Sequence, residues 1–398
     1  MSREVFLYDT VRTPFGKYGG ALAGARPDDL AATVVRGLLD RAPDLDPARV
    51  DEIVMGNANG AGEENRNVAR MAGLLAGLPT SVPGTTVNRL CGSSLDAAMI
   101  GSRQIALDEA DVVIAAGVES MSRAPWVVTM PERPYPAGNA ALTSTTLGWR
   151  LVNPEMPEEW TVSLGEATEQ LREREGVSRD AQDAFALRSH RAADQAWSSG
   201  FYDDHTLAVP GSPLDRDESI RSDTTIEKLA GLAPAFRADG TITAGNASPL
   251  SDGASAVVLG SAEASTTLGK QPMARIAGRG VAALEPQFFG FAPVEAAARA
   301  LARAGIRWAD VDLVELNEAF AAQSLACINA WDIDESIVNV HGGAIAIGHP
   351  LGASGTRILG TLARGLAASG GRWGVAAICI GVGQGLAVVI ENVSPQSS

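Results

Sequence analysis

Two of the three cysteines in this 398-residue chain stand in glycine- and serine-rich segments that could form a reactive site. Cys91 lies in NRLCGSS, directly before small residues and the start of a helical run. A helix N-terminus lowers the pKa of a thiol through its unpaired N–H groups and its macrodipole, and small neighbours leave room for a ligand. The segment therefore predicts a cysteine nucleophile, although a lone cysteine is more often an inert, buried one.

A histidine and a second thiol occur in similar surroundings. His349 precedes a proline and a Gly/Ala/Ser turn that opens another helical run, in HGGAIAIGHPLGASGTR. Cys379 ends a strand-like run and precedes a glycine loop, in AICIGVGQG, whose backbone N–H groups could stabilise an oxyanion. We expect Cys379 and Asn317 on loops after strands, where open α/β sheets place their sites. Cys327 lies at helical spacing in an apolar run and is expected in the core.

The elements that must position these residues alternate along the chain. Strand-like apolar runs are followed by alanine-rich helical runs, the pattern of layered α/β proteins. We expect strands at 51–58, 111–120, 312–320 and 373–385, and helices at 30–42, 97–109, 294–306 and 355–369.

Two pairs of segments repeat one another in the same order. The pairs are 48–58 with 309–319, and 91–120 with 349–385. Chance similarity between ordinary strand–helix–strand units is the alternative for one pair, but two ordered pairs favour a duplication into two α/β halves. Cys91 and His349 then occupy corresponding helix starts, which face one another if the halves pack about a pseudo-two-fold axis.

The stretch between the halves, about residues 121–250, is rich in proline, tryptophan and charge. A structureless stretch of this length is uncommon inside a compact domain, so we expect an inserted loop domain with helices of its own. One of them, near 179–200, is charged and is expected to be solvent-facing. The expected domains are residues 1–265, which include the insertion, and residues 271–394.

Composition and charge narrow the class of protein. The formal net charge of −15 argues against nucleic acid or an anionic membrane as partner, and means that local positive groups must meet any anionic substrate. No apolar run approaches the ~20 residues of a membrane span, and the N-terminus lacks the pattern of a secretory signal. An odd number of cysteines argues against a disulfide framework and for a reducing cytosol. We therefore expect a cytoplasmic protein.

Four segments together resemble the catalytic segments of the thiolases, the acetyl-CoA acyltransferases. They are NRLCGSS, ELNEAFAAQ, GGAIAIGHPLGASGTR and CIGVGQG, and GTITAGNASPLSDGA (240–254) resembles the family's segment that contacts coenzyme A. The likeness extends over about residues 4–392. It implies a five-layered αβαβα fold with a loop domain over the site, in a homodimer or homotetramer. It also implies CoA and acyl-CoA as substrates, with no metal and no tightly bound cofactor.

The resemblance implies a role for each candidate residue. Cys91 would be the acylated nucleophile, His349 would take its proton and help to form an oxyanion hole, and Asn317 would hold a water that completes this hole. Cys379 would exchange a proton with the α-carbon of acetyl-CoA. Backbone N–H groups of Cys91 and Gly381 would form a second oxyanion hole. Two thiols and a histidine would then carry out a reversible Claisen reaction.

Three further residues match positions that contact CoA in the family. Arg221 would lie at the adenine end, and Ser248 and Phe320 along the pantetheine arm. A guanidinium can stack on a base and lie near phosphate. The alternative for Arg221 is a solvated loop residue.

The sequence departs from the family pattern at His341, Pro249 and Ser163, which leaves the acyl chain length and the placement of CoA open. Ser163 stands where short-chain, acetoacetyl-type members often carry a histidine. The segments 62–79 and 145–154 resemble degradative members, particularly those that act on 3-oxoadipyl-CoA in aromatic catabolism.

Other classes of protein remain as alternatives. An acetoacetyl-CoA-specific biosynthetic acetyltransferase is one. A decarboxylating ketosynthase is another, but such enzymes typically need a second catalytic histidine or a His/Asn pair where this chain has Cys379. GVGQG (381–385) could belong to a dinucleotide-binding oxidoreductase, but no helix and no ribose-binding acid follow it. A CoA-binding module without activity would need neither Cys91 nor Cys379.

Overall fold

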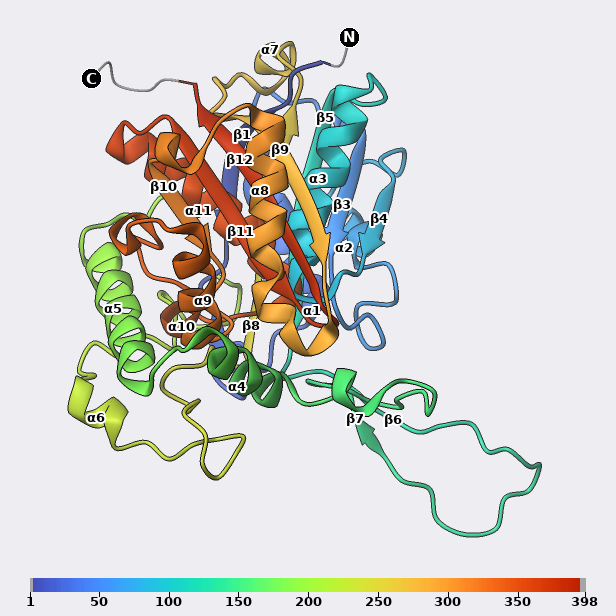
Figure 1. Cartoon of the computed structure of the whole chain (residues 1–398). Helices are drawn as coiled ribbons and strands as arrows, with labels where there is room; N and C mark the ends of the chain where they lie inside the picture. Colours follow the sequence, from blue (N-terminus) through green and yellow to red (C-terminus); the bar gives the residue numbers. More distant parts are fainter. Residues whose placement is uncertain (1–2, 394–398) are drawn as a thin grey trace.

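The computed structural model describes residues 3–393, in which the strands form two groups (Figure 1). The N-terminal group contains β1 (Phe6–Arg12), β2 (Gly16–Lys17), β3 (Glu52–Gly56), β4 (Gly84–Val87), β5 (Val112–Ser120) and β8 (Ser251–Gly260). The C-terminal group contains β9 (Ala274–Ala283), β10 (Leu313–Leu316), β11 (Trp373–Ile380) and β12 (Gln384–Asn392). The groups are joined only by a short pairing of β1 with β9 at Phe6 and Leu7, so the sheet divides into two layers.

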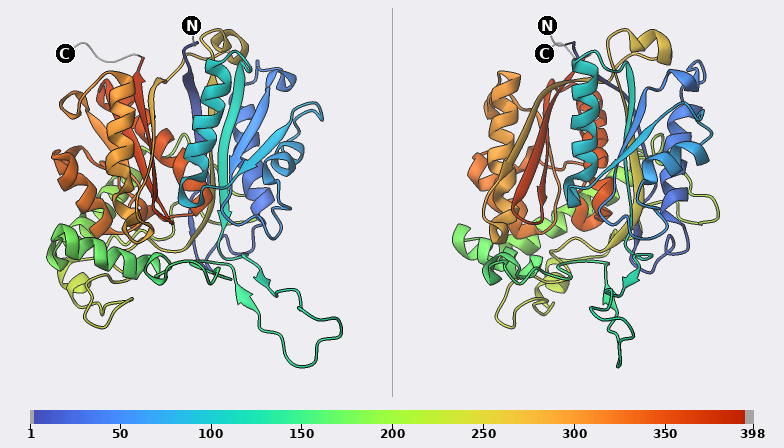
Figure 2. Two further views of the ribbon diagram at one scale, coloured as in Figure 1. Left: turned by 45° about the vertical axis from the view of Figure 1, so that its right-hand side comes forward. Right: turned by 90° about the vertical axis from the view of Figure 1, so that its right-hand side faces the viewer.

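Helices form three further layers, one between the two strand layers and one on each outer face. The central helices α3 (Ser93–Ala106) and α11 (Ser354–Ser369) contact each other and strands of both groups (Figure 2). On the outside, α1 (Pro27–Asp40) and α2 (Val68–Leu75) cover the N-terminal strands, and α8 (Ala292–Ala304) and α9 (Ala321–Trp331) cover the C-terminal ones. Two short helices, α7 (Ala264–Leu268) and α10 (Ala344–Ile347), lie in connections. The order of layers is αβαβα, as the family resemblance implied.

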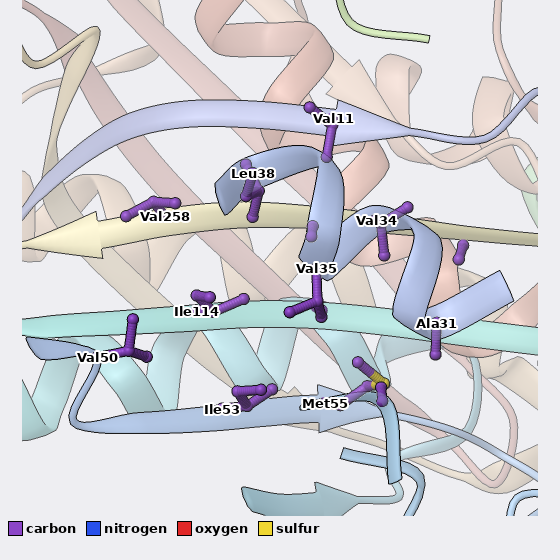
Figure 3. Packing of buried hydrophobic residues seen from close by; sticks show 14 of the residues in the cluster. Val11, Ala31, Val34, Val35, Leu38, Val50, Ile53, Met55, Ile114 and Val258 are labelled. Atoms are coloured by element: carbon purple, nitrogen blue, oxygen red, sulfur yellow. The ribbon is translucent and has the colours of Figure 1, made fainter. Parts of the chain in front are cut away.

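The strands are buried on both faces, so their side chains alternate between two different cores. Ile53 and Ile114 point outward and pack under α1, together with Val35 and Leu38 of that helix (Figure 3). Their neighbours in the strands, such as Val113, point inward to the central helices. Burial of each such side chain contributes about 1.5–3 kcal/mol to the free energy of unfolding.

The predicted repeat corresponds to equivalent elements in the two halves. In the N-terminal half β3 and β5 are parallel and are connected through α3, and in the C-terminal half β10 and β11 are parallel and are connected through α11. A 3-10 turn precedes each central helix, at Leu90–Gly92 and Leu351–Ala353. The starts of these two helices lie side by side, because Thr356 N–H donates to Ser94 Oγ at 3.0 Å.

The central helices approach so closely at Gly355 that a side chain cannot fit there. A Cβ at this position would lie 2.1 Å from the backbone nitrogen of Leu95 in α3. Glycine is therefore required for the packing of the two halves against each other.

The inserted segment forms a layer of loops and helices at one end of the sheets. It contains β6 (Trp126–Val127), β7 (Thr143–Ser144), α4 (Leu164–Glu175), α5 (Arg179–Ser198) and α6 (Ile226–Ala230). The loop between β6 and β7 projects from the body of the molecule (Figure 1). The expectation that the charged helix is solvent-facing was wrong for one side of α5, where Phe185, Ala186 and Ala193 are buried.

Two strands are shorter than their sequences predicted. The run at 312–320 is a strand only over β10, and the run at 373–385 is β11 followed by a turn at 381–383 that leads into β12. Glycines and an asparagine end these strands earlier than their apolar composition indicates. Within residues 3–393, no helix combines the length and the apolar character needed to span a bilayer.

Candidate active site

Cys91 lies in the 3-10 turn that leads directly into α3. Its side chain is 7% exposed and lines two adjoining cavities. Leu90, the residue before it, has a φ of 46°, a left-handed conformation that is rare for leucine. The turn that presents the thiol is thus held in a strained conformation by the surrounding structure.

The pKa of Cys91 is shifted in the direction opposite to the one expected from a helix N-terminus. Burial raises this pKa to about 11 and outweighs the backbone N–H groups of Gly381 and Cys91, which lower it. The sequence-based expectation of a lowered pKa was therefore wrong, because the turn is buried between the two halves. At pH 7 the thiol is neutral, and a base must take its proton when it reacts.

His349 lies between α10 and α11, and its side chain lines one of the two cavities together with Cys91. The backbone N–H of His349 donates to Ser251 Oγ at 3.0 Å. Gly348 has a φ of 114°, and a Cβ there would lie 2.7 Å from Ser251 Oγ. The chain can therefore turn toward the cavity at this point only with glycine.

Ser354 determines which ring nitrogen of His349 carries the proton and which one can accept a proton. Its Oγ lies 2.6 Å from His349 Nδ1 and donates to the Pro350 carbonyl at 2.9 Å. The hydroxyl has one proton and the carbonyl can only accept, so Nδ1 carries the ring proton and donates it to Ser354. Nε2 then has the lone pair of a general base. Burial, with a smaller effect of Arg357, lowers the pKa of His349 to about 3, so the ring is neutral at pH 7.

Asn317 follows β10 and is fully buried beside His349. Its Nδ2 lies 3.4 Å from each ring nitrogen of His349, and its Oδ1 accepts a hydrogen bond of 3.4 Å from Arg357. A guanidinium can only donate, so Arg357 orients the amide with its nitrogen toward the histidine. Arg357 is itself buried and paired with Glu315 at 3.1 Å. No role was predicted for Ser354 or Arg357, although both lie in GHPLGASGTR.

Cys379 is the last residue but one of β11, so the expectation that it lies on a loop was wrong. The strand continues past it because Cys379 pairs with Gly385 of β12. The side chain is fully buried in an apolar cluster with Phe289 and Phe320 and lines neither cavity. Burial raises the pKa of this thiol well above its usual value, and the neighbouring Cys91 contributes to the increase.

The two cavities adjoin at Cys91, and we name each after a residue that lines it alone. The Ser248 cavity, about 430 Å³, is lined by His349, Ser248, Pro249, Phe320, Phe236 and Ser163 among others. The Arg150 cavity, about 350 Å³, is lined by Gly381, Val382, Glu119, Asn59, Thr145 and Arg150 among others. Met121, Leu147, Trp149, Leu164 and Leu351 line both. No role was predicted for these individual wall residues, since nothing in their types separates a cavity wall from a core.

Two of the three expected CoA-contacting residues reach this site. Ser248 donates to the Ala319 carbonyl, and the Phe320 ring meets that of Phe236 edge-on at 6.0 Å in the Ser248 cavity. Arg221 is exposed and lines neither cavity; its backbone N–H donates to His190 Nδ1 at 3.2 Å. His341 also lies elsewhere, stacked on Phe201 with ring centroids 3.5 Å apart.

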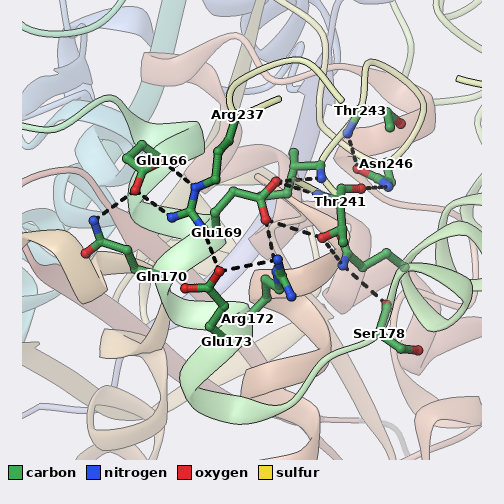
Figure 4. A network of polar contacts seen from close by, with 12 residues as sticks. Glu166, Glu169, Gln170, Arg172, Glu173, Ser178, Arg237, Thr241, Thr243 and Asn246 are labelled. Carbon is green, nitrogen blue, oxygen red and sulfur yellow. Dashed lines mark hydrogen bonds and ion pairs between the residues drawn. The ribbon is translucent and has the colours of Figure 1, made fainter. Parts of the chain in front are cut away.

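Helix α4 closes the Ser248 cavity and is fixed by a polar network (Figure 4). Ser163 caps its N-terminus by accepting the N–H of Glu166. The carboxylate of Glu169, which is fully buried, accepts the N–H groups of Thr241 at 2.7 Å and Ile242 at 2.8 Å. Arg237 pairs with Glu166 at 2.6 Å. These bonds hold α4 to the chain that leads into Ser248.

Glu119 joins the two halves beside Cys91. Its carboxylate accepts N–H groups from Ala58 at 2.9 Å and from Gly352 at 2.8 Å. Burial raises the pKa of Glu119 to about 7. Within residues 3–393, no group of His, Cys, Asp and Glu side chains has the arrangement of a metal site.

Family models of the thiolase N-terminal and C-terminal domains match residues 5–263 and 270–392. The chain belongs to the thiolase family. It is an acyltransferase that acts on CoA thioesters, and it uses CoA as a substrate without a tightly bound cofactor. The fold, the enzyme class and the use of CoA, which the sequence predicted, are thereby confirmed.

Several relatives of this thiolase are similar over their full length. The beta-ketoadipyl-CoA thiolase of Escherichia coli is 47% identical over 98% of this chain and 100% of that protein. The beta-ketoadipyl-CoA thiolase of Pseudomonas aeruginosa is 48% identical over 99% of this chain and 100% of that protein. Among solved structures, the acetyl-CoA acetyltransferase of Bacillus anthracis is 38% identical, with a TM-score of 0.92 over 98% of this chain and 99% of that chain. Human mitochondrial 3-ketoacyl-CoA thiolase in complex with CoA is 38% identical, with a TM-score of 0.91 over 98% of each chain.

Proposed function

We propose that this thiolase degrades 3-oxoacyl-CoA thioesters whose acyl chain ends in a carboxylate, such as 3-oxoadipyl-CoA. The observation that carries this proposal is the identity of 47–48%, over the full length, to beta-ketoadipyl-CoA thiolases from two genera. The identity to the acetyl-CoA acetyltransferase of Bacillus anthracis is lower, at 38%. The biosynthetic, acetoacetyl-specific alternative is therefore the less favoured one.

In the first step, Sγ of Cys91 attacks the C3 carbonyl of the substrate and its proton passes to Nε2 of His349. Both groups are neutral at pH 7, so the proton moves as the carbon–sulfur bond forms. The bond between C2 and C3 then breaks, and its electron pair goes to C2 of the departing acetyl-CoA enolate. His349, with a water held by Asn317, stabilises the enolate oxygen. Cys379 donates the proton to C2, and its raised pKa keeps that proton available.

In the second step, the thiol of CoA gives its proton to the thiolate of Cys379 and attacks the acyl group on Cys91. The bond between the acyl carbon and Sγ then breaks, and Cys91 takes its proton back from Nε2 of His349. Backbone N–H groups of Cys91 and Gly381 stabilise the oxyanion that forms on the acyl carbonyl. The position of the Gly381 N–H beside the thiol supports this assignment, since it lowers the pKa of Cys91. A thioester on cysteine is close in energy to the CoA thioester, so the reaction is reversible.

Thiolysis rates across three substrates test the proposed function. We expect kcat/KM for 3-oxoadipyl-CoA to exceed that for acetoacetyl-CoA and for a long-chain 3-oxoacyl-CoA by about 10-fold or more, because a site that pairs with a polar group rejects substrates without it. The measurement is loss of the 3-oxoacyl-CoA absorbance at a fixed CoA concentration. A preference for acetoacetyl-CoA would contradict the proposal and favour the biosynthetic alternative.

We propose that Arg221 contacts the adenine end of CoA outside the two cavities. Arg221→Ala should raise the KM for CoA several-fold at nearly unchanged kcat, because it removes binding that is equal in the ground and transition states. Lys228→Ala is the matched control, since Lys228 is an exposed cation of the same segment that already pairs with Asp223 at 2.6 Å. A wild-type KM in Arg221→Ala would show that the adenine end is bound elsewhere.

We further propose the domain boundaries 1–265 and 271–394, with the loop domain inserted at about 121–250. The ranges of the two family models, 5–263 and 270–392, support the boundaries. We also propose that the protein forms a homodimer or homotetramer and that it is located in the cytoplasm. The three unpaired cysteines are consistent with a reducing compartment.

A further inference from the structure

The Arg150 cavity contains a cation that the reaction at Cys91 does not use. Its walls are largely apolar side chains and backbone, and Arg150 is the only lysine or arginine among the residues that line it. The Ser248 cavity has none, and its histidine is neutral at pH 7. Among residues 3–393, Arg150 is therefore the single positive charge at the walls of the two cavities that meet at Cys91.

The guanidinium of Arg150 has no acidic partner among residues 3–393. Its hydrogen bond is a long one, from Nη1 to the Thr145 carbonyl at 3.5 Å. Some other arginines of the inserted segment are paired, such as Arg237 with Glu166 and Arg179 with Asp183. An unpaired guanidinium presents parallel N–H groups in the geometry that a carboxylate accepts.

The segment that leads into Arg150 is held by hydrogen bonds at Thr145 and Trp149. Asn59 donates to the Thr145 carbonyl at 3.1 Å and to its hydroxyl at 2.9 Å, and that hydroxyl donates to the Pro125 carbonyl at 2.6 Å. Trp149, the residue before Arg150, donates its ring N–H to the Val162 carbonyl at 3.2 Å. The guanidinium therefore extends from a held segment, which reduces the entropy lost when it binds a ligand.

The position of Cys91 determines which part of a substrate enters the Arg150 cavity. In a 3-oxoacyl-CoA, the carbon attacked by Cys91 has the CoA thioester on one side and the rest of the acyl chain on the other. We assign the thioester side to the Ser248 cavity, because it is lined by Ser248 and Phe320, which the family resemblance places along the pantetheine arm. The acyl chain beyond C3 then extends into the other cavity, toward Arg150.

We propose that Arg150 binds the distal carboxylate of the acyl chain, both in the substrate and in the acyl-enzyme on Cys91. This inference rests on the proposed function and names the residue that would recognise the charge. The protein has a net charge of −15, and Glu119 lines the same cavity, so an anionic acyl chain needs a cation there. An acyl chain that ends in a methyl group gains nothing from Arg150.

The test compares 3-oxoadipyl-CoA with 3-oxohexanoyl-CoA, which has the same number of acyl carbons and no carboxylate. Arg150→Ala should lower kcat/KM for 3-oxoadipyl-CoA by about 10- to 100-fold, the usual effect of removing a charged hydrogen-bond partner, and leave 3-oxohexanoyl-CoA unchanged. Arg150→Lys should restore part of the loss, because it keeps the charge without the paired N–H groups. Arg133→Ala, an exposed arginine between β6 and β7 that lines neither cavity, is the control.

The results separate this inference from the proposed function. Suppose that the wild-type enzyme prefers 3-oxoadipyl-CoA. If Arg150→Ala then loses kcat/KM equally on both substrates, or on neither, the role of Arg150 alone is overturned. A wild-type enzyme that does not prefer 3-oxoadipyl-CoA over 3-oxohexanoyl-CoA would overturn the proposed function, and the carboxylate site with it.

Discussion

Replacement of Cys91 by serine should lower the rate of thiolysis by about a thousandfold or more, because an alcohol is a far weaker nucleophile than a thiol at neutral pH. Serine is smaller than cysteine and Cys91 lines two cavities, so the fold has no reason to change. Mass spectrometry after addition of a 3-oxoacyl-CoA should detect an acyl group on the wild-type protein and none on Cys91→Ser.

Cys327→Ser is the matched control for this variant. Cys327 is fully buried, lines neither cavity and donates to the Gly290 carbonyl at 3.2 Å, a bond that a serine hydroxyl can replace. Thiolysis by Cys327→Ser should stay near the wild-type rate, and iodoacetamide should label Cys91 faster than Cys327. With a pKa near 11, labelling of Cys91 should rise roughly tenfold per pH unit between about pH 7 and 9. Retained thiolysis in Cys91→Ser would remove this residue from the role of nucleophile.

Cys379→Ser should separate the two partial reactions. Cleavage and formation of the carbon–carbon bond should fall by about 10²- to 10⁴-fold, the usual contribution of a positioned acid or base. Exchange of label between acetyl-CoA and radiolabelled CoA should persist, because transfer of an acyl group to and from Cys91 needs no proton at the α-carbon. The two rates are measured on the same preparation.

The burial of Cys379 makes the exchange reaction a necessary part of this test. A fully buried side chain in β11 could affect the rate by disturbing the strand, and such a disturbance would reach both partial reactions. Equal losses in exchange and in carbon–carbon chemistry would therefore assign Cys379 a structural role.

The sequence was sufficient to predict the layered fold and the residues around the thiol. Each catalytic candidate stands next to a helix start or a strand end, and small residues mark these positions because the chain must turn sharply there. Gly348 and Gly355 illustrate this, since a Cβ at either position would collide with the other segments of the site. Their types are determined by local geometry, which is visible in a sequence.

Properties that depend on distant contacts could not be predicted in this way. The pKa of Cys91 is raised because two halves of the chain bury it, and desolvation exceeds the local effect of the helix start. The orientation of Asn317 by Arg357 joins residues that are 40 positions apart. The role inferred for Arg150 depends on a cavity wall assembled from separate loops, which the likeness of the segment 145–154 to degradative members did not reveal.

The close packing of α3 against α11 makes activity depend on the assembly of the two halves as well as on the folding of each. Cys91 belongs to the N-terminal half and His349 to the C-terminal half, and the bonds from Thr356 to Ser94 and from Gly352 to Glu119 hold them in place. Each half also has an apolar core of its own beneath its outer helices. A partial opening of the boundary between the halves would thus separate the nucleophile from its base while both cores remain folded, and the enzyme would lose activity at a lower temperature than it loses secondary structure.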